Sequence, residues 1–305
     1  MPEGPEIRRA ADRVASVLVD RVVEEARLHL PGLQPLESRL AGRAVTAVDT
    51  RGKAMLTRFD NGLTLYSHNQ LYGRWYTVAR PRMPKTTRQL RVELHTATHS
   101  ALLYSASDVE ILTDLQLAAH PFLSRLGPDV MDRELTAEQL QERLTNPAFL
   151  RRSSGSLFLD QRFLAGIGNY LRSEILFIAG VHPARRPTDL EARELGKLSS
   201  NAIRTARRSY RTGGVTVLPT LERQLKKNGW SFERRRFYVF GRDGERCHVC
   251  GDRIERMAVS GRNLYLCPAC QPKRPECRFA PFLRYLTVLR PDTAFKRREP
   301  KPCPI

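Results

Sequence analysis

Residues 247–270 read CHVCGDRIERMAVSGRNLYLCPAC, and the spacing of their cysteines decides how this part of the chain folds. The segment between the cysteines is rich in strand-forming residues around Ser260-Gly261, which predicts a β-hairpin. Four thiolates at its base can surround one tetrahedral zinc ion, and a site closed in this way is structural rather than catalytic. The thiols form two CxxC pairs separated by sixteen residues: Cys247 with Cys250, and Cys267 with Cys270.

Arg262 follows the turn of this predicted hairpin. Most arginines at the tips of loops are solvated and have no further role. A basic side chain on a rigid hairpin can also hold a phosphate group. The spacing alone favours neither interpretation.

The chain upstream of the hairpin, residues 131–236, has mainly a helical pattern. At residues 165–169 the sequence AGIGN provides two glycines, which allow a tight turn between helices and a close approach of the backbone to a ligand. Residues 213–236 show no clear period, and we predict a mobile loop there. Two capping boxes predict the starts of two helices: Thr136 with Gln139, and Thr188 with Glu191.

The first 130 residues combine one helix with a β domain. Apolar residues recur every three or four positions from Pro5 to Leu18, which predicts a helix with one buried face. Asn61-Gly62 is typical of a hairpin turn. Short runs of β-branched and aromatic residues predict antiparallel strands at 43–50, 54–59, 63–68, 74–79, 91–97 and 101–107.

These patterns together predict an α+β protein. We expect an N-terminal helix packed on a β-sandwich, then a helical domain, and finally the zinc hairpin. The chain then ends in a basic tail that we expect to be flexible. The predicted boundaries are 1–130 for the sandwich, 131–236 for the helical domain, 237–271 for the hairpin and 272–305 for the tail.

The charge of the chain points to a polyanionic partner. The 305 residues carry a formal net charge of +19, with a pI near 10.3, and lysines and arginines that neutralise phosphates release condensed counterions. An acidic membrane surface is the alternative polyanionic partner. The last 35 residues alone hold nine Lys or Arg and three Asp or Glu, a net +6, which suggests non-specific affinity for DNA.

The sequence also bears on where the protein works. No apolar run approaches the roughly 20 residues of a membrane span, and the start lacks the order of a signal peptide, so we expect no membrane association. We expect instead a bacterial-type cytoplasm, in association with the nucleoid, where thiols stay reduced. Cys277 and Cys303 lie outside the paired motif and are interpreted as spare thiols.

Two segments of the β domain have residues that can act on DNA. Lys53 lies in the tight turn TRGKA, where a lysine is usually solvated but can also donate a proton or contact a phosphate. Gln70, Leu71 and Tyr72 lie between two predicted strands. Leu71 and Tyr72 can simply cover a core, but on a strongly basic protein an exposed triplet of this kind can also enter a base stack.

The N-terminus, MPEGPE, offers a nucleophile if Met1 is removed. Many proteins begin with Met-Pro, so methionine removal alone carries no function. Removal would leave Pro2 with a free secondary amine, and an α-amino group, with a pKa of about 7.7–8, is partly unprotonated near neutral pH. Glu3 is adjacent and can move protons, and Glu6 is one helical turn further on.

Several motifs of the chain together resemble those of a known family. From residue 1 to about residue 271 it is similar to the bacterial formamidopyrimidine-DNA glycosylase/endonuclease VIII family, and PEGPE and NQLYG favour the endonuclease VIII branch. The motifs that carry the resemblance, besides the zinc hairpin, are PEGPEIRRAAD at 2–12, TRGKAMLT at 50–57, LTLYSHNQLYG at 63–73, LLYSASD at 102–108, HPFLSRLGPDV at 120–130 and LDQRFLAGIGNYLRSEIL at 159–176.

The resemblance implies a bifunctional DNA glycosylase/AP lyase of base excision repair. Pro2 would attack the deoxyribose C1′ of a damaged nucleotide to form a Schiff base, and Glu3 would protonate the sugar or base. Lys53 would donate a proton during strand cleavage, and Arg262 would hold the phosphate and assist the second of the β- and δ-eliminations. The residues implied in DNA binding are Gln70, Leu71 and Tyr72 in the duplex void, and Arg125 and Asn169 on backbone phosphates.

The resemblance further implies oxidised pyrimidines as substrates, damaged double-stranded DNA as partner, one structural zinc and no redox cofactor. We expect a monomer. Residues 211–236 and the tail depart from the endonuclease VIII pattern, so oxidised purines such as 8-oxoguanine and formamidopyrimidines are the alternative substrates. A DNA-binding protein without activity is a second alternative, against which the joint presence of Pro2, Glu3 and Lys53 argues.

Overall fold

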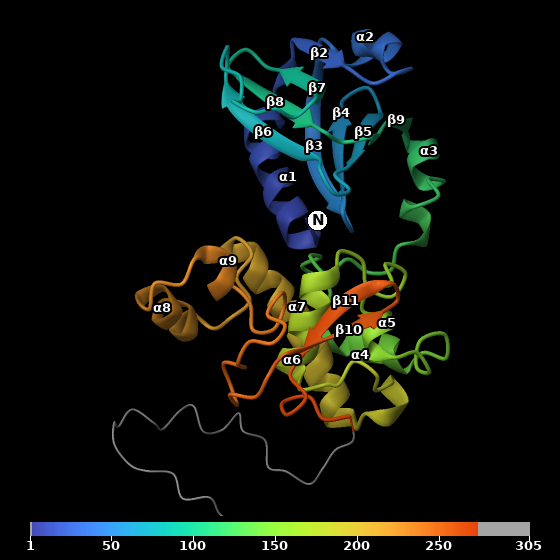
Figure 1. The fold of residues 1–305 in the computed structure, drawn as a ribbon. Helices are drawn as coiled ribbons and strands as arrows, with labels where there is room; N and C mark the ends of the chain where they lie inside the picture. Colours follow the sequence, from blue (N-terminus) through green and yellow to red (C-terminus); the bar gives the residue numbers. More distant parts are fainter. Residues whose placement is uncertain (1, 274–305) are drawn as a thin grey trace, which may run out of the picture.

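The computed structural model describes residues 2–273, which form two lobes joined at a narrow waist (Figure 1). The N-terminal lobe holds helix α1 and strands β1 to β9, and the C-terminal lobe holds most of the helices and the β10–β11 hairpin. The predicted basic tail, apart from positions 272 and 273, lies outside the described residues. Cys277 and Cys303 are in this part of the tail. Within residues 2–273 no helix is both long enough and apolar enough to cross a membrane.

Two antiparallel sheets form a sandwich in the N-terminal lobe, and helix α1 (Gly4–Leu18) contacts strands of both. One sheet has the order β1-β3-β4-β5-β9 and the other the order β2-β7-β8-β6. The buried face of α1 follows the predicted period and joins both sheets in one core. The strands are β1 (Val22–Val23), β2 (Glu25–Leu28), β3 (Arg43–Arg51), β4 (Ala54–Phe59), β5 (Leu63–His68), β6 (Arg74–Ala79), β7 (Leu90–His95), β8 (His99–Tyr104) and β9 (Asp108–Thr113).

The predicted α+β class and the helix on a β-sandwich are confirmed. Each of the six predicted strand segments overlaps a strand, and the Asn61-Gly62 turn joins β4 to β5 with Gly62 at φ +75°. Strands β1, β2 and β9 were not predicted. The first two are only two and four residues long, and polar residues occupy half of β9, so none of them shows a strong strand pattern.

Helix α6 is the centre of the C-terminal lobe. It packs against α7 and against strand β11 of the hairpin, and the eight residues from Tyr170 to Phe177 are all buried. The longest helix of this lobe is α7, with 21 residues, and shorter helices and the hairpin surround α6 and α7. Besides α1 and the strands of the sandwich, the elements of the described chain are η1 (Gln34–Leu36), α2 (Glu37–Leu40), α3 (Asp114–Ala118), η2 (Leu123–Arg125), α4 (Ala137–Thr145), α5 (Ser154–Leu157), α6 (Asn169–Ala179), η3 (Pro187–Asp189), α7 (Ala192–Thr212), α8 (Pro219–Lys227), α9 (Phe232–Arg235), β10 (Glu255–Val259) and β11 (Arg262–Leu266).

One of the two predicted capping boxes is correct and the other is wrong. The Thr136 hydroxyl accepts the N–H of Gln139 at the start of α4, as predicted. Helix α7 begins three residues later than predicted, because Glu191 is its N-cap and its backbone N–H donates to the Glu194 carboxylate at 2.9 Å. Thr188 lies instead within the short helix η3.

The prediction of a loop at residues 213–236 is also wrong, because the segment contains helices α8 and α9. Pro219 occupies the first turn of α8, where its missing N–H costs nothing. Leu225 is the buried residue of α8, and α9 has none, so the apolar period that signals a helix is absent. The guanidinium of Arg234 lies 4.8 Å from the ring of Trp230, which stabilises the link between the two helices.

Candidate active site and zinc hairpin

The start of helix α1 meets the start of helix α6 at the waist of the molecule. The N–H of Gly4 donates to the carbonyl of Gly166 at 2.8 Å, and Gly166 has a φ of +90°. A Cβ on Gly168 would lie 2.4 Å from the carboxyl group of Glu3, so the backbone can approach this closely only at glycine. The glycines of AGIGN were predicted to let the backbone approach a ligand, and in the structure the group that Gly168 approaches is the Glu3 side chain of the other lobe.

Glu3 is buried at this junction, with 2% of its surface exposed. Its carboxylate accepts three backbone N–H groups at the start of α6, which would otherwise lack partners. The distances are 2.6 Å from Gly168, 2.9 Å from Tyr170 and 3.3 Å from Leu171. Burial raises the pKa of Glu3 to about 7, although the charge of Lys53 and the N–H donors oppose this shift. Glu3 can therefore hold a proton near neutral pH and give it up.

Lys53 lies in the turn between β3 and β4 and is 8% exposed. Burial lowers the pKa of Lys53, the negative charge of Glu3 opposes this, and the positive charge of Arg262 adds to it. The turn itself is held by Asp129, because the N–H of Gly52 donates to Asp129 Oδ2 at 2.7 Å. The structure thus brings Lys53 within electrostatic reach of both Glu3 and Arg262, while Pro2 directly precedes Glu3.

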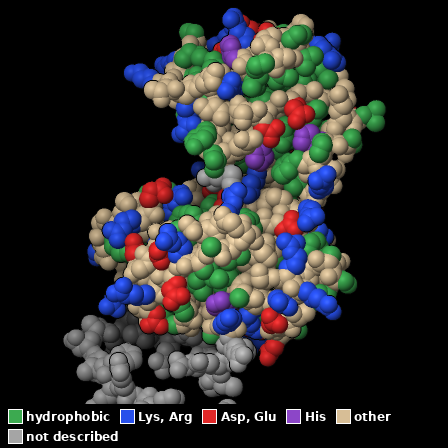
Figure 2. Space-filling view, turned by 45° about the vertical axis from the view of Figure 1, so that its right-hand side comes forward, with side chains coloured by type: hydrophobic (Ala, Val, Ile, Leu, Met, Phe, Trp, Pro, Cys, Tyr) green, Lys and Arg blue, Asp and Glu red, His purple; other side chains and the backbone are tan. Residues whose placement is uncertain are grey.

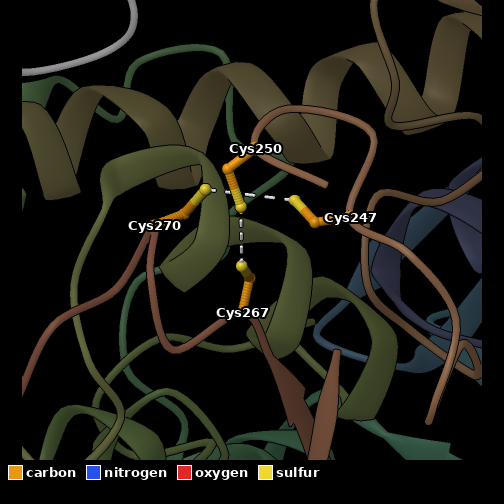
Figure 3. Close-up of side chains that lie close together, drawn as sticks. All are labelled: Cys247, Cys250, Cys267 and Cys270. Atoms are coloured by element: carbon orange, nitrogen blue, oxygen red, sulfur yellow. Dashed lines mark hydrogen bonds between the residues drawn. The ribbon is translucent and has the colours of Figure 1, made fainter. Parts of the chain in front are cut away.

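The four cysteines of the two CxxC pairs converge as predicted (Figure 3). Their sulfur atoms all lie within 4.8 Å of one another. The Sγ–Sγ distances are 3.9 Å between Cys247 and Cys270 and 3.4 Å between Cys250 and Cys267. Zinc–sulfur bonds of about 2.3 Å in a tetrahedron place sulfur atoms roughly 3.8 Å apart, so these residues fit one structural zinc ion.

The hairpin predicted between the two CxxC pairs consists of β10 and β11. Val259 and Arg262 are register partners beside its turn. Arg262 is exposed at the start of β11. Asn169, at the start of α6, donates from Nδ2 to the carbonyl of Asn263 at 2.7 Å. Its Oδ1 accepts a hydrogen bond from Arg172 Nη2 at 2.6 Å. The Nδ2 group has two hydrogens, so a second one remains for another partner. Asn169 therefore joins the glycine turn to the hairpin.

The predicted triplet is exposed on the loop between β5 and β6. Leu71 and Tyr72 are 60% and 69% exposed, so the interpretation as a cover for a core is wrong. Gln70 has a φ of +45°, and its N–H donates to His68 Nδ1 at 3.2 Å. Gly73 closes the loop by donating to the carbonyl of Asn69 at 2.7 Å. Two large apolar side chains are thus held out into solvent on a tight, hydrogen-bonded loop.

Arg125 is exposed at the end of η2, in the connection between the lobes. Figure 2 shows that the surface is hollowed at the waist and that Lys and Arg side chains lie beside this hollow. A basic surface of this kind attracts phosphates.

Three residues that the sequence interpretation missed support these groups. Asp129 holds the turn of Lys53, His68 accepts the N–H of Gln70, and Arg172 bonds to Asn169. Burial and the charge of Lys53 both lower the pKa of His68, while Asp108 opposes the shift. Asp129 and His68 accept hydrogen bonds from backbone N–H groups, and such bonds leave no spacing pattern in the sequence.

Three family models match the chain in succession. They are the formamidopyrimidine-DNA glycosylase N-terminal domain at residues 1–107, the formamidopyrimidine-DNA glycosylase H2TH domain at 126–219, and the zinc finger found in FPG and IleRS at 244–273. Endonuclease 8 of Escherichia coli K12 and endonuclease 8 of Salmonella agona are each 49% identical to it over 271 residues, which is 89% of this chain and 100% of the relative.

A solved structure of Lactococcus lactis Fpg in complex with DNA containing an abasic site has the same fold. Its TM-score is 0.73 at 20% identity, over 89% of this chain and 100% of that one. The chain belongs to the formamidopyrimidine-DNA glycosylase/endonuclease 8 family of DNA-repair enzymes, which are DNA glycosylases and AP lyases. The match to the zinc-finger model agrees with the four-cysteine cluster, and one structural zinc is the metal of this chain.

Proposed function

We propose that the protein releases oxidised pyrimidines from damaged double-stranded DNA through a Schiff base on Pro2 and then cuts the strand by β- and δ-elimination. The observation that carries this proposal is the buried Glu3 carboxyl group, with its pKa near 7, next to Pro2 and in the field of Lys53. A proton donor that works near neutral pH is what base release by an amine requires. Endonuclease 8 relatives at 49% identity support the pyrimidine branch of the family.

In the first step, removal of Met1 frees the Pro2 nitrogen, which attacks C1′ of the damaged nucleotide. The bond from C1′ to the base breaks, and the base leaves with the bonding electrons and takes up a proton. The sugar ring then opens, the ring oxygen O4′ becomes a hydroxyl, and C1′ and the Pro2 nitrogen form an iminium ion. Glu3 gives its proton to the leaving base, because burial keeps its carboxyl group protonated up to about pH 7. The proton that the attacking Pro2 nitrogen loses then passes through the Glu3 carboxylate to O4′.

In the second step, the iminium acts as an electron sink. C2′ loses a proton and the bond from C3′ to O3′ breaks, which releases the downstream strand with a 5′-phosphate. C4′ then loses a proton and the bond from C5′ to O5′ breaks, which leaves a 3′-phosphate upstream. Water hydrolyses the remaining iminium and frees Pro2. The C2′ proton passes to the Glu3 carboxylate and the C4′ proton to water. Lys53 donates a proton and contacts a phosphate during strand cleavage, and Arg262 holds the departing phosphate in the second elimination.

The remaining residues bind the duplex around the damaged nucleotide. Extruding a base costs a few kcal/mol, which contacts to the strand and a filler for the gap must offset. Gln70, Leu71 and Tyr72 fill the gap, which their exposed loop allows. Asn169, through its remaining Nδ2 hydrogen, and Arg125 hold backbone phosphates.

Base preference is tested with a panel of duplexes that each carry one lesion. We expect single-turnover release of thymine glycol and 5-hydroxycytosine to exceed release of 8-oxoguanine by about tenfold or more, the size of effect that a few pocket contacts provide. Faster release of 8-oxoguanine or a formamidopyrimidine would show that the purine alternative is correct.

A further inference from the structure

A cavity of about 540 Å³ lies where the two lobes meet, and none of the proposed catalytic or DNA-binding residues lines it. Helix α1 and the end of strand β3 form its wall in the N-terminal lobe. The last turns of α7 and residues 129–134, in the connection between the lobes, form the opposite wall. Sites for small molecules have volumes of about 300–1,000 Å³, so this cavity is large enough for an organic ligand.

Five arginines and three acidic residues line this cavity, which gives the lining a formal net charge of +2. Arg8 pairs with Asp12 at 2.6 Å, whereas the other four arginines form no ion pair within residues 2–273. Among the acidic side chains, Asp129 already accepts two backbone N–H groups and Asp132 accepts one. The cavity therefore holds more positive charge than its own acidic groups neutralise. The five arginines are Arg8, Arg51, Arg133, Arg207 and Arg211.

Hydrogen bonds hold the walls of the cavity in place. Arg207 Nη2 donates to the backbone carbonyls of Asp132 and Arg133, at 3.1 Å each, which fastens the connection between the lobes to α7. Tyr210 of α7 donates its hydroxyl proton to Asp12 Oδ2 of α1 at 2.5 Å, which joins the two walls. The cavity is therefore formed before any ligand binds, and both lobes contribute to it.

The side chains of the lining suit a ligand that combines phosphate groups with a ring. Arg133 and Arg211 are exposed, and a guanidinium offers a planar fork of donors that binds two phosphate oxygens at once. Tyr210 and Met131 add an aromatic ring and an apolar side chain, the kind of surface on which a base stacks. We propose that this cavity binds a nucleotide, with its phosphates on Arg133 and Arg211 and its base against Tyr210.

A nucleotide in this cavity contacts both lobes and so stabilises their present arrangement. The cavity also adjoins the turn of Lys53, because Arg51 and Asp129 line it and Asp129 Oδ2 accepts the N–H of Gly52 at 2.7 Å. Nucleotide binding itself does not depend on the proposed catalytic role of Lys53. The test therefore measures binding without DNA and leaves Arg51 and Asp129 unchanged.

The test is isothermal titration calorimetry of the full, zinc-loaded chain with ADP at constant ionic strength. We expect one ADP per chain with a dissociation constant below about 1 mM, binding of pyrophosphate that is weaker by about tenfold or more, and no binding of adenosine. Arg133→Gln and Arg211→Gln should each weaken ADP binding by about tenfold or more, the loss of one charge-assisted hydrogen bond. Arg151→Gln, an exposed arginine of the same lobe outside the cavity, is the matched control and should leave the affinity for ADP unchanged.

Hydrogen exchange locates the bound nucleotide independently. ADP should slow amide exchange at residues 131–134 and 207–211 and leave that of strands β7 and β8 unchanged. Equal affinities for ADP and pyrophosphate would show that the site takes phosphates without a nucleoside, which contradicts a nucleotide site. Unchanged affinity in both arginine variants, or protection at the start of α6 instead, would place ADP on the proposed DNA-binding surface and overturn the proposal. Absence of ADP binding would overturn it as well.

Discussion

Replacing Glu3 by glutamine is expected to slow base release by about 10²- to 10⁴-fold, the usual contribution of a positioned acid or base. Glutamine keeps the size of the side chain but cannot donate a carboxyl proton. It also turns an NH₂ group toward N–H donors at the start of α6, where Glu3 accepts from Gly168 and Tyr170. We therefore expect a loss of stability of about 1–3 kcal/mol as well, from donors left without acceptors.

Two measurements separate the chemical effect of Glu3→Gln from the structural one. Cleavage at a preformed abasic site should fall less than base release, because no base remains to be protonated. Base release by the unaltered protein should also decline as the pH rises through about 7, where the folded protein loses the Glu3 proton, and the variant should lack this dependence. Equal losses on both substrates, with the pH profile retained, would exclude Glu3 as the proton donor.

Removal of zinc is expected to weaken DNA binding by about 10- to 100-fold, since the contact that we propose between Arg262 of the hairpin and a phosphate would be charge-assisted, and such contacts are worth about 1.5–3 kcal/mol each. The N-terminal sandwich should keep its fold, because its core contains no residue of the zinc cluster. Chelation and Cys250→Ser provide two independent ways to remove the metal.

Fluorescence anisotropy with a lesion duplex measures the affinity, and circular dichroism at strand wavelengths measures the sandwich. Cys277→Ser, a cysteine outside the two CxxC pairs, is the matched control and should keep zinc and affinity. A sandwich that unfolds together with the hairpin on chelation would contradict the independence of the two lobes.

The sequence was sufficient for features that have a local pattern. Paired cysteines determine the zinc hairpin, because their spacing alone brings four sulfur atoms together. The strands of the sandwich and helix α1 follow from period and turn residues in the same way. Helices α8 and α9 were missed because they bury too little for a period to appear, and the start of α7 was misplaced because Glu191 competes with Thr188 as a cap.

The arrangement of the site could be predicted only in part. Pro2, Glu3 and Lys53 were selected from the sequence, but the contact between Glu3 and Gly168 spans 165 residues and has no local signal. Asp129 and Arg172 were missed for a related reason. Their partners are largely backbone groups, such as the N–H of Gly52 and the carbonyl of Asn263, and backbone groups are present at every position.

The central claim, an amine nucleophile at Pro2, is tested most directly by borohydride trapping. Reduction of the iminium by borohydride during reaction with a lesion duplex should yield a stable covalent complex of protein and DNA. Peptide mapping of that complex should place the adduct on the N-terminal proline of protein from which Met1 has been removed. Absence of any adduct with such protein, or an adduct on a lysine such as Lys53, would contradict the account.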